Sequence, residues 1–228
     1  MARRIMNALK PYYTQNILEA GIDEAGRGPL FGRVYVGVAI LPQDTNDFNH
    51  SLMKDSKKFT SKEKIMEAYD YIKDYAIDYE VAWCDEDTID RINIRNAVHK
   101  AMHDAVSNLR VKPQHLLVDG HDFTPYAVTN DNDEFVTIPH TCIEGGDNKF
   151  TPIAAGSILA KVERDAYIEE MCETYPNLVD FYDLQNNKGY GTKNHLAGIK
   201  KHGISEWHRK TFGICKSFAK KPEEVCLL

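Results

Sequence analysis

The sequence has no long apolar run, and its start has no apolar stretch. Its longest apolar segment, residues 34–41, is far shorter than the ~20 residues that a membrane-spanning helix needs. The start of the chain carries Arg3, Arg4 and Lys10 where a signal peptide would have a hydrophobic stretch. We therefore expect a cytoplasmic protein that does not span a membrane.

Cysteine is scarce. The chain has five cysteines, which are odd in number and widely scattered, and no two of them form a Cys-x-x-Cys pair. This pattern argues against a zinc or redox motif. We interpret the five as ordinary reduced thiols, as is usual in a reducing compartment. They are Cys84, Cys142, Cys172, Cys215 and Cys226.

Features that would separate domains are also missing, since no repeat, low-complexity tract or Pro/Gly-rich linker divides the chain. At 228 residues, with 43% hydrophobic and 27% charged residues, the composition is close to that of ordinary globular proteins. We therefore expect one domain, or one domain with an appendage.

An excess of positive charge is missing as well, because the formal net charge is -6. Taken alone, this charge argues against a strong non-specific nucleic-acid binder. Near the C-terminus, however, nine basic residues accompany a single acid, Glu206. A solvated helical face and a phosphate-binding surface explain this cluster equally well. The nine are Lys188, Lys193, Lys200, Lys201, Arg209, Lys210, Lys216, Lys220 and Lys221.

Hydrophobic periodicity predicts that strands and helices alternate along the chain. Residues 17–22 and 33–41 are predicted to form two antiparallel strands joined by a Gly-rich turn. Residues 79–83 and 115–118 are predicted to form two more strands. This alternation favours an α/β fold in which helices flank a mixed β-sheet.

Three longer helices are expected between and after these strands. The first should start near Thr60, which has capping-box spacing with Glu63. The second should cover residues 89–109. The third should have Thr151 as its N-cap and a proline in its first turn. After Pro176 the chain is expected to form short basic helices and loops.

Two adjacent carboxylates, Asp23 and Glu24, stand at the end of the first predicted strand. A desolvated carboxylate needs a cation or several hydrogen-bond donors to remain ionised, and a divalent metal meets that need. For the pair alone, a solvent-exposed turn with incidental acids is the simpler interpretation. The glycines that follow, together with Arg27, favour a site for phosphate and metal, because they let the backbone approach a ligand closely.

Two further acids stand beside glycines at the ends of predicted elements. Asp119 precedes Gly120 after a compact apolar strand, and Asp147 follows two glycines. Each acid by itself is more simply a turn-forming residue. Their recurrence predicts that they converge at one end of the sheet with Asp23 and Glu24. Ligation by oxygen alone favours hard cations such as Mg²⁺ or Mn²⁺.

Six motifs follow one another along the chain: residues 23–29 (DEAGRGP), 55–58 (DSKK), 118–120 (VDG), 146–147 (GD), 154–165 (AAGSILAKVERD) and 189–192 (GYGT) with His195. Their order and spacing resemble those of the type 2 ribonuclease H family, ribonuclease HII. The resemblance runs from about residue 21 to residue 212, which is nearly the whole chain. One acid pair would be weak evidence, whereas six motifs in order are specific.

The resemblance implies a ribonuclease H-like domain in residues 1–175 and a helical, basic C-terminal region in residues 176–228, packed on the same domain. It implies an endoribonuclease that cuts 5′ of ribonucleotides in RNA–DNA hybrids and of single ribonucleotides in duplex DNA. Four convergent carboxylates suit two-metal catalysis by Mg²⁺ or Mn²⁺, which leaves a 5′-phosphate and a 3′-hydroxyl.

The resemblance also implies roles for individual residues. The metal-binding carboxylates would be Asp23, Glu24, Asp119 and Asp147. Gly26, Arg27 and Gly28 would read the ribose 2′-hydroxyl, Tyr190 would stack at the RNA–DNA junction, and Lys57 and Lys161 would contact phosphates. For Lys161, a lysine on a helix surface is an equally good interpretation. His195 either assists proton transfer or orders its loop.

The chain departs from the family pattern between Asp119 and Asp147. This stretch is longer than usual, and Gly145 replaces a common lysine, so the alignment of Asp147 depends on how the insertion folds. We expect the acids of the insertion to belong to a solvated hairpin loop. These acids are Asp122, Asp131, Asp133 and Glu134.

Three other assignments explain less of the sequence. A nucleic-acid-binding module without activity would not need all four acids. A DNA nuclease or a transposase-like enzyme on a related fold would not need the turn at Gly26–Gly28, since DNA has no 2′-hydroxyl to recognise. A type 3 ribonuclease H fits less well, because only about twenty residues precede Asp23 and Arg27 matches the type 2 motif.

Overall fold

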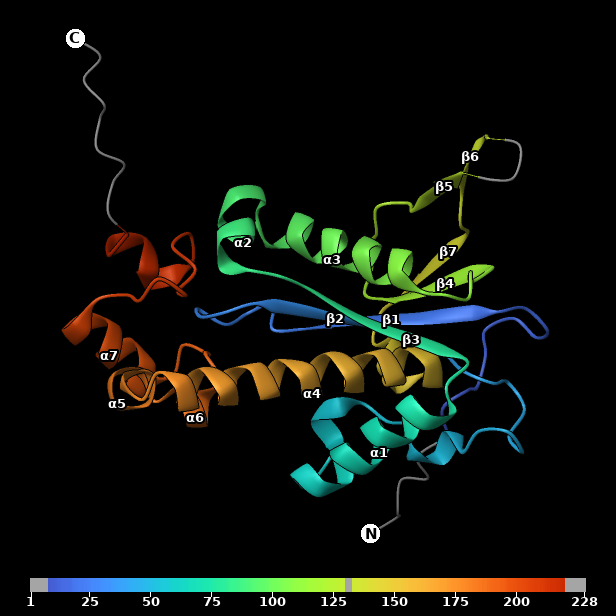
Figure 1. Ribbon diagram of the computed structural model, residues 1–228, viewed down its shortest axis with the longest axis horizontal. Helices are drawn as coiled ribbons and strands as arrows, with labels where there is room; N and C mark the ends of the chain where they lie inside the picture. Colours follow the sequence, from blue (N-terminus) through green and yellow to red (C-terminus); the bar gives the residue numbers. More distant parts are fainter. Residues whose placement is uncertain (1–7, 130–132, 220–228) are drawn as a thin grey trace.

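The computed structural model describes residues 8–129 and 133–219. A five-stranded sheet in the order β3-β2-β1-β4-β7 forms the centre of the molecule. Helix α3 covers one face of this sheet and helix α4 the other (Figure 1). The strands are β1 (Glu19–Ala25), β2 (Val34–Ile40), β3 (Asp78–Cys84), β4 (His115–Asp119) and β7 (His140–Ile143). The helices on the two faces are α3 (Ile94–Asn108) and α4 (Thr151–Thr174).

The sheet is mixed, as the sequence predicts. Strand β1 pairs antiparallel with β2 and parallel with β4. The first strand runs on to Ala25, beyond the predicted residues 17–22, so that Asp23 and Glu24 lie within it. The α/β fold class and the predicted β1–β2 hairpin are confirmed.

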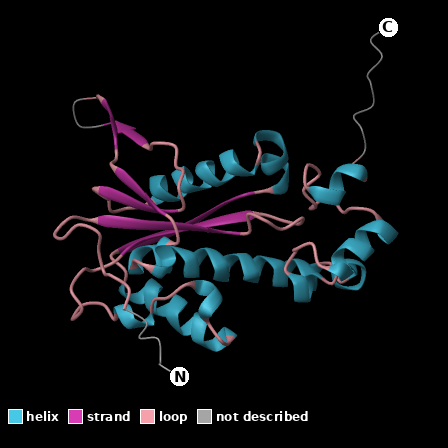
Figure 2. Cartoon of the chain, turned by 180° about the vertical axis from the view of Figure 1, so that it is seen from behind, coloured by secondary structure: helices cyan, strands magenta, loops and turns pink. Residues whose placement is uncertain are grey.

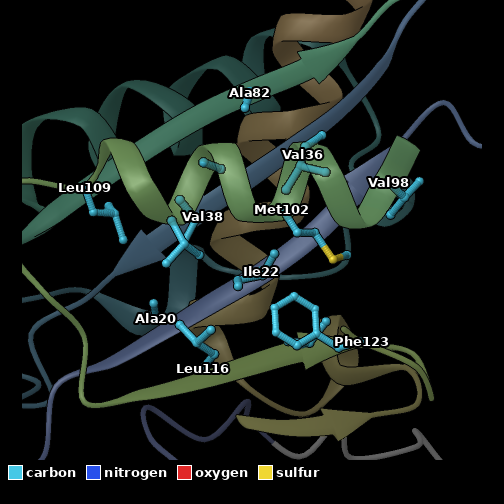
Figure 3. Close-up of a cluster of buried hydrophobic side chains, with 14 of the residues drawn as sticks. Ala20, Ile22, Val36, Val38, Ala82, Val98, Met102, Leu109, Leu116 and Phe123 are labelled. Carbon is cyan, nitrogen blue, oxygen red and sulfur yellow. The ribbon is translucent and has the colours of Figure 1, made fainter. Parts of the chain in front are cut away.

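The core lies between the sheet and the two helices. Every residue of β2 is buried, because helices cover this strand on both faces. Figure 3 shows side chains of the sheet, such as Ile22 and Val38, packed beneath Met102 of α3. On the other face, a Cβ atom on Gly37 would lie 2.2 Å from the carbonyl oxygen of Gly156. Glycine at this position therefore lets α4 pack directly on the strand.

Two predicted helix boundaries were wrong. Helix α1 (Lys62–Tyr75) starts near Thr60 as expected, although the hydroxyl of Ser61 caps it and not that of Thr60. Thr151 is the first residue of α4 and not its N-cap, and its hydroxyl bonds to His50 instead. The predicted helix over residues 89–109 is two helices, α2 (Glu86–Ile92) and α3, which Asn93 separates with a φ of 66°. Such a positive φ cannot continue a right-handed helix.

The chain after α4 forms short helices and loops, as expected. They pack around the C-terminal end of α4, at the end of the molecule opposite the small hairpin of β5 (Ala127–Thr129) and β6 (Phe135–Thr137) (Figures 1 and 2). The helices are α5 (Asn177–Tyr182), α6 (Leu184–Asn187), α7 (Lys193–His202) and the 3₁₀ helix η4 (Gly213–Ser217).

The insertion between Asp119 and Asp147 forms the two-stranded hairpin β5 (Ala127–Thr129) and β6 (Phe135–Thr137). The prediction of a hairpin is therefore confirmed. Asp133 is exposed beside β6, and Asp122 forms an ion pair with Arg95 before the hairpin starts. Asp131 lies outside the described residues.

In the described part of the chain, no helix is long and apolar enough to cross a membrane. Four cysteines are free thiols, in agreement with the interpretation of the five as reduced: Cys84, Cys142, Cys172 and Cys215. Cys226 lies outside the described residues.

Candidate metal and substrate site

The register of two parallel strands brings the first acids together. Ile22 of β1 lies beside Val118 of β4, so the next residues, Asp23 and Asp119, reach the same end of the sheet. Asp23 is only 6% exposed, and Glu24 is partly buried. Three of the four predicted carboxylates are therefore neighbours in the fold.

Burial raises the pKa of Asp23 well above its ordinary value, and the charges of Asp119 and Glu24 raise it further. Hydrogen bonds from Ser157 and from the backbone N–H of Glu24 partly offset this effect. Burial also raises the pKa of Glu24, although Arg27 acts in the opposite direction from 3.4 Å. The ionised acids therefore repel one another in a poorly solvated place, which a bound cation would relieve.

Asp147 joins this group through the short 3₁₀ helix η3 (Gly146–Asn148), which precedes α4. The Gly146 N–H donates to Oδ1 of Asp119 at 2.6 Å, which ties the two acidic segments together. Burial raises the pKa of Asp147, and the charges of Asp55 and Asp119 raise it further. The structure thus brings Asp147 close to Asp119 despite the inserted hairpin.

Asp55 is an acid of this neighbourhood that the sequence analysis did not single out. It accepts hydrogen bonds from the Lys57 N–H at 2.9 Å and from Nδ2 of Asn148 at 3.2 Å. Its place in the DSKK motif, residues 55–58, is the sequence feature that could have identified it as a site residue.

A second residue that the sequence did not reveal is Ser157, which supports Asp23 through a hydrogen bond. Ser157 of α4 is 5% exposed, hydrogen-bonds to Asp23 and lies with its Oγ 3.0 Å from Oγ of Ser56. The sequence feature that could have identified Ser157 is a serine among the small apolar residues of α4, because a buried hydroxyl needs a hydrogen-bond partner.

The acids suit a hard divalent cation, although the described residues contain no ready-made group of three or more His, Cys, Asp or Glu ligands. Mg²⁺ often binds through one or two protein carboxylates and takes its other ligands from water and substrate phosphate. The donors here are all carboxylate oxygens, and the raised pKa values of Asp23 and Asp147 mark a place that favours added positive charge. These residues fit Mg²⁺ or Mn²⁺.

The glycine-rich turn lies next to the acids. Gly26 has a φ of 91°, and a Cβ atom there would lie 2.2 Å from Nε of Arg164, so no other residue fits this place without movement. Arg27 and Gly28 are exposed. A Cβ atom on Gly28 would lie 3.7 Å from the ring of Tyr190. The structure thus places the predicted substrate-binding residues of the turn and Tyr190 side by side.

The two predicted lysines differ in their surroundings. Lys57 is exposed, and its charge lowers the pKa of both Glu24 and Asp147, so it lies close to the acids. Lys161 forms an ion pair with Asp165, one helical turn later on α4. This pairing is what the helix-surface interpretation of Lys161 expects.

His195 is completely buried, and its Nδ1 lies 2.9 Å from the backbone carbonyl of Tyr190. Its Nε2 lies 3.0 Å from Nε2 of His208. Of the two roles considered for His195, this geometry supports the one in which it orders the loop of Tyr190.

The basic C-terminal cluster needs one correction. Arg209 is 0% exposed and therefore cannot contact phosphates. Lys188 and Lys210 form ion pairs with Glu169 and Asp87. The exposed lysines that remain for substrate are Lys193, Lys200, Lys201 and Lys216. Lys220 and Lys221 lie outside the described residues.

Comparisons of sequence and of structure with known proteins both point to ribonucleases H. The family model for ribonuclease HII matches residues 20–215. Ribonuclease HII of Bacteroides thetaiotaomicron is 44% identical over 206 residues, which cover 90% of this chain and 94% of that protein. Ribonuclease H2 from Pyrococcus horikoshii OT3 is similar in structure, with a TM-score of 0.69 and 25% identity over 88% of this chain and 96% of the other. Bst-RNase HIII, solved in complex with Mn²⁺, shares the fold, with a TM-score of 0.61 and 20% identity over 88% of this chain and 68% of the other.

Proposed function

Because the chain belongs to the ribonuclease HII family and is a type 2 ribonuclease H, we propose that it cuts 5′ of ribonucleotides. Its substrates are RNA–DNA hybrids and duplex DNA that carries single ribonucleotides. The products are a 5′-phosphate and a 3′-hydroxyl. Cleavage at a lone ribonucleotide would begin its removal from DNA, as in ribonucleotide excision repair.

We propose that Asp23, Glu24, Asp119 and Asp147 hold two divalent cations, Mg²⁺ or Mn²⁺. When bound, such a pair activates the attacking water and stabilises the leaving oxygen. The fold holds these carboxylates at one end of the sheet. The parallel register of β1 and β4 and the bond from Gly146 to Asp119 support this role.

Recognition of ribose is assigned to the turn and to Tyr190. A 2′-hydroxyl can donate and accept hydrogen bonds, so the close backbone of Gly26–Gly28 can distinguish ribose from deoxyribose. The half-exposed ring of Tyr190 lies beside Gly28, where it can stack on the sugar or base at the junction. Lys57 lies on the side of the acids and would contact a phosphate, and Lys161 is a weaker candidate because Asp165 already binds it.

We also propose that residues 1–175 form the catalytic domain and that residues 176–228 complete its substrate surface. Tyr190 belongs to the second segment, yet its ring faces the turn of the first. The described part of the second segment also pairs with the turn directly, through a bond from the Gly32 N–H to the carbonyl of Trp207.

The observation that carries the proposal is that the ribose-facing turn is continuous with the acid pair, since Arg27 contacts Glu24 at 3.4 Å. A nuclease for plain DNA has no need of such a turn there. Steady-state cleavage of two matched duplexes, with and without one ribonucleotide, tests the function. We expect cleavage 5′ of the ribonucleotide only. Equal cleavage of both duplexes would indicate a DNA nuclease, and binding without metal-dependent cleavage would indicate a binding module.

A further inference from the structure

Arg209 is the largest completely buried side chain of the described chain, and all five of its N–H donors are used. Each donates to a backbone carbonyl oxygen of the turn between β1 and β2. Nε binds Gly32 at 2.8 Å, Nη1 binds Arg27 at 3.0 Å and Pro29 at 2.9 Å, and Nη2 binds Gly26 at 2.6 Å and Arg33 at 3.1 Å.

Packing alone does not explain an arginine at this place. A buried guanidinium pays a large desolvation cost, which an apolar side chain of similar size would avoid. Burial, with the nearby charge of Arg164, lowers the pKa of Arg209 to about 9, so the group is still charged at neutral pH. All its side-chain hydrogen bonds in the described structure are to carbonyls of the turn, and a planar fork holds several acceptors in fixed directions.

The turn needs such a partner because residues 26–33 belong to no strand ladder. Buried carbonyl groups that no ladder satisfies must find other donors. The backbone around Arg209 holds the side chain in place, since its own N–H donates to the carbonyl of Leu30 at 2.8 Å. His208 forms an isolated bridge with Phe31. The guanidinium is thus fixed beneath the turn.

Because Arg209 binds the carbonyls on one side of the turn, peptide geometry also fixes the direction of the N–H groups on the other side. In a planar trans peptide, the C=O of one residue and the N–H of the next point in opposite directions. The carbonyls of Gly26 and Arg27 point inward to Nη2 and Nη1 of Arg209. The N–H groups of Arg27 and Gly28 must therefore point outward, and both of these residues are exposed.

We propose that Arg209 is a positioning residue for substrate recognition. It turns the peptide groups 26–27 and 27–28 so that the N–H groups of Arg27 and Gly28 face the ribose and its 2′-hydroxyl. The inference rests on the proposed function, because it assigns a cause to the ribose-reading geometry of the turn. Arg209 itself touches no substrate.

The test compares Arg209→Met, which keeps the length of the stem and removes all five donors, with Arg209→Lys, which keeps the charge. Lys210→Met is the matched control next in the chain, because Lys210 is exposed and pairs with Asp87. Ile72→Ala is the control for lost stability, since Ile72 is fully buried in a cluster that contains no residue of the turn. All variants are assayed at a temperature at which unfolding curves show them folded.

Two readouts are measured on the full chain. In hydrogen exchange, we expect the segment 26–33 to lose protection in Arg209→Met and not in the controls. On a duplex with one ribonucleotide, kcat of Arg209→Met should fall on the order of a hundredfold, because small misplacements of the reacting group are costly. KM should change by less than about threefold, since the phosphate contacts remain. Arg209→Lys should restore only a minor part of the rate, because three donors on one nitrogen cannot reproduce the fork.

The outcomes separate this inference from the function on which it rests. If wild-type protein prefers the ribonucleotide duplex and Arg209→Met exchanges and cuts like Lys210→Met, Arg209 is not a positioning residue. If Ile72→Ala loses kcat as strongly as Arg209→Met at equal stability, the effect is general, and the inference is overturned. If wild-type protein cuts both duplexes equally, the proposed function itself is wrong.

Discussion

His195 and His208 meet nitrogen to nitrogen beneath the loop of Tyr190, with their Nε2 atoms 3.0 Å apart. The Ser205 N–H donates to Nδ1 of His208, so this nitrogen carries no proton. Neutral His208 is then protonated on Nε2 and donates to His195. His195 in turn is protonated on Nδ1 and donates to the Tyr190 carbonyl at 2.9 Å. One backbone donor therefore fixes both tautomers and holds the loop.

This pair predicts a loss of stability in mild acid. Burial, with His195 adding to it, lowers the pKa of His208 to about 3. The unfolded chain takes up the proton near pH 6.5 and the folded chain does not, so stability falls as the pH drops from about 6.5 toward 3. By pH 5 this amounts to about 2 kcal/mol. Urea unfolding at pH 7.5 and pH 5 should show a smaller loss for His208→Gln than for wild type. An exposed control, His121→Gln, should behave like wild type, and equal losses in all three would contradict the prediction.

The acid pair predicts opposite effects on activity and on stability. Asp23→Asn should lower kcat on the order of a thousandfold, because a lost metal ligand costs several kcal/mol in the transition state. Without metal, the same variant should unfold at a temperature no lower than that of wild type, since it removes a buried charge beside Asp119. Thermal unfolding with and without Mn²⁺ checks this, and Mn²⁺ should stabilise wild type more than the variant. Asp119→Asn should also be inactive. Near-normal cleavage by either variant would rule out the site.

Asp147 should be as important as Asp23, although a long insertion precedes it. Asp147→Asn is expected to be comparably inactive, because Asp147 is buried beside Asp55 and Asp119. Asp133→Asn and Glu134→Gln, both on the exposed hairpin, should cut at the wild-type rate. Single-turnover cleavage of one ribonucleotide duplex compares the three. A harmless Asp147→Asn together with an inactive hairpin variant would mean that the fourth acid has been misassigned.

The exposed lysines of α7 should contribute sequence-independent affinity. The double variant Lys200→Ala, Lys201→Ala is expected to bind every duplex more weakly and to flatten the plot of log affinity against log salt by about 0.9 per lost contact. The matched control is Lys64→Ala, Lys73→Ala, two exposed lysines of α1. Binding titrations between low and moderate salt provide the slopes. Identical slopes for the two double variants would make the α7 lysines a merely solvated face.

Tyr190→Ala should reduce cleavage at a single-ribonucleotide junction by about ten- to a hundredfold, which is the range of one lost aromatic stack. Binding of the same duplex should weaken less, because phosphate contacts dominate affinity. Tyr190→Phe keeps the ring and should retain most of the rate. Cleavage rates and dissociation constants for the three proteins decide the matter, and unchanged junction cleavage by Tyr190→Ala would remove Tyr190 from the site.

Much of the fold follows from local pattern. Short apolar runs, rich in β-branched residues in β2, identify the first two strands, and the turn between them is visible as a run of glycines. The predicted helix boundaries were wrong where a single residue decides where a helix begins or ends. Ser61 competes with Thr60 as a cap, and Asn93 breaks a helix that periodicity alone would continue. Both choices depend on single backbone angles, a φ of -152° at Ser61 and of 66° at Asn93, which periodicity does not record.

The proposed chemistry can be predicted from local pattern, because carboxylates at strand ends and a Gly-Arg-Gly turn are local features in a fixed order. Which of these groups meet depends on the fold. The register of β1 on β4 places Asp23 beside Asp119. Arg209 stands in a basic segment and looks like a phosphate contact, yet it is buried against Gly26, 183 positions away. Local pattern records periodicity and turns, whereas burial and register arise from contacts between distant segments, so a residue's neighbours in sequence do not reveal them.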